Sequence, residues 1–64
     1  MMTPEEFKFA MMDASLTTYE FEGLHYFDHE SAHLKMDDLM CQVLRELGYG
    51  EGIDIFRQTK KWYA

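Results

Sequence analysis

The sequence contains a single cysteine, Cys41, so no disulfide can form within one chain. A lone cysteine fits a reducing compartment, where we expect it to pack as a small apolar residue. No apolar run is long enough to cross a membrane, and the N-terminus lacks the basic region of a signal peptide. These absences argue against a secreted disulfide scaffold and against membrane binding, and we expect a cytoplasmic protein.

Basic residues are also scarce, because six lysines and arginines stand against twelve acids and give a formal net charge of −6. The excess lies in residues 1–30, where Lys8 is the only base. Without a basic stripe, the chain is not expected to bind nucleic acid through phosphate contacts. The acidic half indicates either a solvated face or a surface for a basic protein.

Apolar residues are abundant by contrast. Hydrophobic residues make up 47% and aromatic residues 16% of the 64-residue chain, which is close to the size limit for a stable isolated domain. We expect more apolar surface than one copy can bury, and therefore self-association or a patch that faces a protein partner. The residues expected to form this interaction surface are aromatic: Tyr19, Phe21, Tyr26, Phe27, Trp62 and Tyr63.

The first helix is expected over about residues 3–16. Thr3 and Glu6 form a capping-box pair, and Pro4 suits the first helical position. One apolar stripe follows helical spacing and consists of Phe7, Ala10, Met11 and Ala14. Phe9, Met12 and Leu16 widen it, which predicts that this helix is covered on more than one side.

The second helix is expected over about residues 28–47, between an Asp28 N-cap and the helix-ending Gly48. Its apolar residues fall in one sector: Met36, Met40, Val43, Leu44 and Leu47. Its polar residues gather on the opposite side: Lys35, Asp38, Gln42, Arg45 and Glu46. A third helix over about residues 51–61 should pack antiparallel to the second, because the linker between them is short.

Residues 17–27 are ambiguous, because aromatic residues alternate with acids on both sides of Gly23. A short hairpin that turns at Glu22-Gly23 is one interpretation. We favour an aromatic connection that lies over the core, since an isolated hairpin is weak. The sequence therefore predicts one small all-α domain of three helices over residues 1–64, with Trp62 and Tyr63 docked against it.

His29-Glu30-Ser31-Ala32-His33 matches the H-E-x-x-H motif. In zinc peptidases this spacing places two histidines on one helical face, and the glutamate activates a bound water. Asp37 lies one turn further on and is the candidate third ligand. The alternative function is therefore a zinc-binding protein or zinc metallopeptidase, with Glu30 as its catalytic residue.

Helix geometry argues against that alternative. Side chains at four-residue steps drift by about 40° per step around a helix, so His29, His33 and Asp37 converge poorly on one tetrahedral ion. The helical wheel also places both histidines towards the core, and His29 lies in the first turn. We therefore expect no enzyme activity, no cofactor and no metal, and a structural hydrogen bond between His33 and Asp37.

Residues 30–64 resemble a group of small, largely uncharacterised proteins of bacteriophages and prophages. The residues that carry the resemblance are Ala32-His33, Asp37, Leu39, Leu44-Arg45-Glu46-Leu47-Gly48-Tyr49, Phe56 and the closing Lys61-Trp62-Tyr63-Ala64. The resemblance implies a compact helical protein of phage or prophage origin, but no particular activity. Together with the composition, it predicts a non-enzymatic accessory protein that binds another protein or itself.

Overall fold

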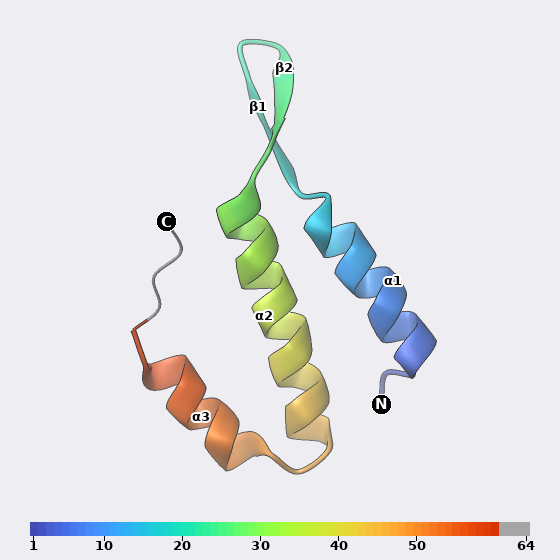
Figure 1. Cartoon of the computed structure of the whole chain (residues 1–64), viewed down its shortest axis with the longest axis vertical. Helices are drawn as coiled ribbons and strands as arrows, with labels where there is room; N and C mark the ends of the chain where they lie inside the picture. The colour runs from blue at the N-terminus through green and yellow to red at the C-terminus, as the bar shows by residue number, and fades with distance from the viewer. Residues whose placement is uncertain (61–64) are drawn as a thin grey trace.

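The computed structural model describes residues 1–60, which form three helices and one two-stranded antiparallel sheet (Figure 1). The elements in chain order are α1 (Pro4–Ser15), β1 (Thr18–Phe21), β2 (Leu24–Phe27), α2 (His29–Glu46) and α3 (Gly50–Gln58). The three predicted helices are confirmed, and α1 and α2 end within one residue of expectation. Helix α3 ends earlier than expected, because Thr59 has an extended backbone with ψ at 131°.

The prediction of an all-α fold is wrong at residues 17–27. Tyr19 pairs with Tyr26 and Phe21 with Leu24, so a two-residue turn joins β1 to β2. Glu22 and Gly23 both have positive φ, 52° and 79°, as a type I′ turn requires. The segment does not lie over the core as favoured above. Both strands are exposed along their whole length, and the hairpin extends beyond the ends of the helices (Figure 1).

The N-termini of α1 and α2 are capped as the sequence predicts. Thr3 Oγ1 accepts from the Glu6 backbone N–H, and the Glu6 carboxylate accepts from the Thr3 backbone N–H at 2.9 Å. Asp28 caps α2 by accepting from the Ser31 backbone N–H at 3.0 Å. The Asp28 N–H in turn donates to the Thr17 carbonyl, which ties the base of the hairpin to the start of α2.

The three helices lie side by side in a single layer, with α2 between α1 and α3 (Figure 1). The thinnest extent of the molecule is 12 Å, about the diameter of one helix with its side chains. Its radius of gyration is 13.8 Å, whereas a compact domain of this length has about 11 Å. The layer therefore leaves both of its broad faces open to solvent.

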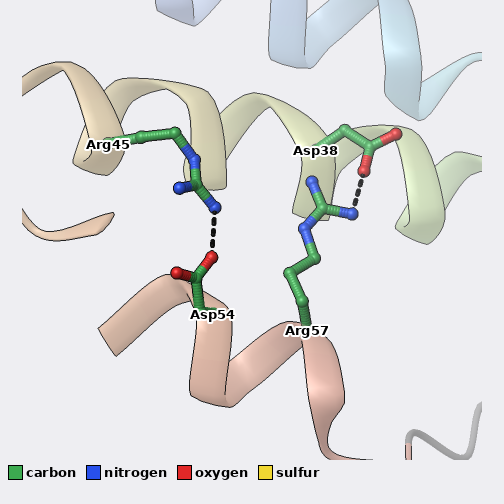
Figure 2. A network of polar contacts seen from close by, with 4 residues as sticks. All are labelled: Asp38, Arg45, Asp54 and Arg57. Carbon is green, nitrogen blue, oxygen red and sulfur yellow. Dashed lines mark hydrogen bonds and ion pairs between the residues drawn. The ribbon is translucent and has the colours of Figure 1, made fainter. Parts of the chain in front are cut away.

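Helices α2 and α3 exchange two ion pairs (Figure 2). Arg45 of α2 contacts Asp54 of α3 at 2.9 Å, and Arg57 of α3 contacts Asp38 of α2 at 2.7 Å. All four side chains are well exposed, so these contacts align the two helices more than they stabilise them.

The buried core is small. The apolar residues that are almost completely buried are Ala14, Ala32, Cys41 and Ile53, of which only Ile53 is large. Cys41 is a free, buried thiol, as expected. The carboxylate-bearing Asp37 is also buried, with 9% of its surface exposed. With so few buried side chains, much of the apolar content of the chain remains on its surface.

Candidate protein interaction surface

Helix α1 carries apolar side chains on two opposite sides. Ala10 and Ala14 line the groove between α1 and α2, so this side contacts the neighbouring helix. At about 100° per residue, Phe9, Met12 and Leu16 lie on the opposite side of α1. Their exposed fractions are 56%, 52% and 64%. We call these three residues the outer stripe. The sequence predicts cover on more than one side, but within residues 1–60 only the side towards α2 is covered.

The hairpin separates its side chains into two faces. Because paired residues of an antiparallel sheet share a face, Tyr19, Phe21, Leu24 and Tyr26 all lie on one side. We call them the aromatic face. Tyr19 stacks on Tyr26 with ring centroids 5.5 Å apart. Each of the four is exposed by 42% or more. Thr18, Glu20, His25 and Phe27 form the other face.

The outer stripe and the aromatic face follow each other directly in the chain, since only two residues separate Leu16 from Tyr19. Of the residues expected to form an interaction surface, the structure brings Tyr19, Phe21 and Tyr26 together. Phe27 lies on the other face of the hairpin, where its ring stacks against His29 with centroids 6.3 Å apart. Trp62 and Tyr63 lie outside the described residues.

Sequence reasoning missed Leu24 and the outer stripe as parts of this surface. In the sequence, Leu24 and Tyr26 are apolar residues on either side of the polar His25. In a β-strand this pattern places Leu24 and Tyr26 on the same face. The signal for the outer stripe was the spacing of Phe9, Met12 and Leu16, which are three and four residues apart. That spacing is typical of a helix that packs lengthwise against another helix.

The H-E-x-x-H residues lie on the first turns of α2. His29, Glu30 and His33 are all exposed, so the expectation that both histidines face the core is wrong. The reason is that α1 and α3 contact α2 from opposite sides. The groove residues Leu39 and Gln42 face α1, whereas Cys41 faces α3. The sector that contains the histidines is left on an open face of the layer.

Asp37 differs from these histidines because its side chain is buried. It lines an apolar groove of about 250 Å³ between α2 and α3, together with Met40, Leu44 and Phe56. Within residues 1–60, no group of three or more histidine, cysteine or acidic side chains is arranged to hold a metal ion. The hydrogen bond between His33 and Asp37 remains a prediction, as does the absence of a catalytic role for Glu30.

A second apolar groove, of about 380 Å³, lies where the start of α1 meets the end of α2. Met2, Phe7, Val43 and Leu47 contribute to its walls. Met1 is 83% exposed and Leu47 is 55% exposed, so the groove is shallow. The groove is the space between the ends of the two helices. No ionisable side chain lines it, so it offers no side chain for acid–base chemistry.

The perturbed pKa values belong to groups that hold the elements together. Hydrogen bonds from Thr3 lower the pKa of the Glu6 carboxyl, and hydrogen bonds from Ser31 lower that of Asp28. The hydrogen bond to Asp38 raises the pKa of the Arg57 guanidinium. Each shift favours the charged form that makes the contact, so the electrostatics point to helix capping and helix alignment.

Comparison of the chain with protein-family models, with curated proteins and with solved structures gives no match. In the part of the chain that the structure describes, no helix combines the length and the apolar character needed to cross a membrane.

Proposed function

We propose that this chain is a small non-enzymatic protein whose role is to bind protein through the outer stripe of α1 and the aromatic face of the hairpin. The observation that carries the proposal is the apolar pattern on two sides of α1, of which residues 1–60 cover only the side towards α2. The resemblance of residues 30–64 leads us to propose a phage or prophage setting. We propose no bound cofactor or metal.

The shape of the molecule supports this proposal. The described residues form a single helical layer with four well-buried apolar residues, and aromatic side chains are left in water. A chain of this size tolerates such exposure poorly. Large contiguous apolar patches on small proteins mark surfaces that other proteins cover. The hairpin adds to the argument, because two strands alone are only marginally stable in water.

Photo-crosslinking in living cells tests the proposed function. A photoreactive phenylalanine analogue replaces Met12 in the outer stripe or Phe21 in the aromatic face, one position per variant. We expect irradiation to link each variant covalently to a protein, because both side chains are half exposed in the isolated chain. The products are separated by mass, and their composition is determined by peptide sequencing.

Ile55 of α3 provides the matched control, since it is a large apolar residue that is 69% exposed and lies on another element. The analogue at Ile55 should give little crosslinked protein. Absence of products from positions 12 and 21, or equal yields from all three positions, would show that the outer stripe and the aromatic face are not a protein-binding surface.

A further inference from the structure

We infer that the partner on this surface is a second copy of the chain, with the two α1 helices packed in parallel about a twofold axis. This inference rests on the proposed function and names its partner. Phe9 and Met12 occupy positions a and d of a heptad, and Leu16, the C-cap of α1, follows at the next a position, which is the spacing with which one helix packs along another. In a parallel pair each of these residues meets its own counterpart.

The charges beside the outer stripe decide the orientation. Glu6 and Asp13 lie along the flank of the stripe that is nearer to α2, where Asp13 also lines the groove between α1 and α2, and Lys8 lies along the other flank. In an antiparallel pair, like flanks meet, so the acidic flanks of the two copies would repel each other. In a parallel pair, opposite flanks meet, and Lys8 of each copy faces Asp13 of the other. Glu5 precedes Met12 by one heptad and would meet its own counterpart in a parallel pair, so the parallel contact begins at Phe9. From Phe9 to Leu16, the flanking charges are complementary only in the parallel orientation.

Lys8 is already positioned beside the stripe. Its ammonium group lies over the Phe9 ring at 5.8 Å from the centroid. In the parallel pair this placement sets the ammonium group at the border of the apolar contact, where it can reach a carboxylate of the second copy.

Parallel pairing also brings the two hairpins together. Each hairpin follows the C-terminal end of its α1 and extends beyond the helices (Figure 1). With both α1 helices pointing the same way, both hairpins lie at the same end of the dimer. Their aromatic faces then have a partner within reach, and this supplies the packing that an isolated two-stranded hairpin lacks. An antiparallel pair would place the hairpins at opposite ends.

The area available approaches what a stable dimer needs. The seven side chains of the outer stripe and the aromatic face are 42% to 64% exposed. An aromatic side chain has about 200 Å² of surface, so seven residues near this size present roughly 700 Å² per chain. A standard protein interface uses about 800 Å² from each partner. Either segment alone would fall well short of this value, whereas the two together approach it.

Sedimentation equilibrium of the purified full chain measures the association directly. We expect the wild-type chain at micromolar concentration to have twice the monomer mass of 7.6 kDa. Leu16→Glu places two charges in the interface, between the outer stripe and the aromatic face, and should weaken dimerisation at least about a hundredfold. Ile55→Glu makes a comparable change at an exposed position of α3 and should leave the mass unchanged. Circular dichroism verifies that both variants keep their helix content.

Charge exchange tests the orientation. Lys8→Glu and Asp13→Lys should each weaken the dimer about tenfold, because each turns two attractive contacts into repulsive ones. The double variant restores the attraction with reversed signs and should recover most of the wild-type affinity. Spin labels at Glu22, in a Cys41→Ser background, should lie close together across the dimer, since parallel pairing places both hairpin turns at one end.

The dimer and the proposed function can fail independently, because different measurements test them. A wild-type chain that remains monomeric at about a hundred micromolar overturns the dimer. If photo-crosslinks from positions 12 and 21 then reach a different protein, the proposed function stands without it. A dimer that Leu16→Glu leaves intact, or that shows no rescue in the double charge variant, overturns the parallel arrangement.

Discussion

Glu6 and Asp28 are the carboxylates that cap α1 and α2, and they make the fold sensitive to acid. Hydrogen bonds from Thr3 and Ser31 lower their pKa values below the ordinary 4.5 and 3.8. The folded state therefore binds these protons less tightly than the unfolded state. Their contribution is fully present above about pH 4.5 and is lost as the pH falls through the lowered pKa values. Urea unfolding at about pH 6 and about pH 3.5 should show lower stability in acid.

Glu6→Gln combined with Asp28→Asn provides the control for this pH dependence. Glutamine and asparagine keep an oxygen that accepts from the backbone, so both caps persist near neutral pH. The double variant should lose less stability than the wild type between the two pH values. An unchanged slope would mean that other carboxyl groups account for the acid sensitivity.

His33 and Asp37 test the structural interpretation of the H-E-x-x-H segment. Asp37 is buried and His29 is exposed, so His33→Ala and Asp37→Ala should each cost about 1 kcal/mol or more, and His29→Ala should be nearly neutral. Chemical unfolding with and without a chelator measures these changes. Equal losses at His29 and His33 that disappear with the chelator, together with zinc in the native mass spectrum, would support the zinc alternative instead.

At the scale of the elements, the hairpin depends on a turn that its sequence does not favour. Glu22 adopts φ 52°, a conformation in which asparagine or glycine is usual. Replacing Glu22 by asparagine should stabilise the hairpin by about 0.5 kcal/mol, because Asn-Gly is the preferred dipeptide of this turn. Hydrogen exchange of the β1 and β2 amides reports the change.

Gly23→Ala is the opposing variant, since Gly23 has φ 79° and alanine is strained there. It should speed exchange of the same amides while leaving the α3 amides unchanged. Faster exchange throughout the chain would show that the hairpin and the helical layer unfold together.

The sequence predicts the helices whose starts are fixed by contacts between neighbouring residues. The Thr3-Pro4-Glu6 start and the Asp28 cap locate α1 and α2 closely, because each rests on contacts within one turn. The hairpin is harder to predict, because the Tyr19–Tyr26 contact that supports it joins two strands and no local rule supplies it.

The arrangement of the helices was harder to predict than their limits. A helical wheel identifies the apolar sector of α2, but it does not say which sides the neighbours occupy. Helices α1 and α3 contact α2 from opposite sides, so His29 and His33 are left exposed instead of facing a core. The ion pairs that Arg45 and Arg57 make also do not follow from the sequence, because they join residues of two different helices whose relative position no local pattern gives.

At the scale of the whole molecule, the stability of a single helical layer should depend on its association with a second copy. If a second copy covers the outer stripe and the aromatic face, the melting temperature must rise with protein concentration, because mass action favours the paired state. Thermal unfolding followed by circular dichroism at about one and about a hundred micromolar measures this. Leu16→Glu should melt at one temperature across that range. A wild-type melting temperature independent of concentration would contradict the dimer.

The order of the elements lets each chain fold before it meets a second copy. β1 pairs with β2, and α2 packs against α3, which follows it in the chain. α1 packs against α2, and only the hairpin separates these two helices in the sequence. The described contacts therefore join elements that are near neighbours in the chain. Chains with such local contacts fold within microseconds to milliseconds. Two copies at about a micromolar concentration meet only on a timescale of about seconds. Each newly made chain would therefore wait as a folded single layer, with both hairpin strands open as edges to whichever chain arrives first.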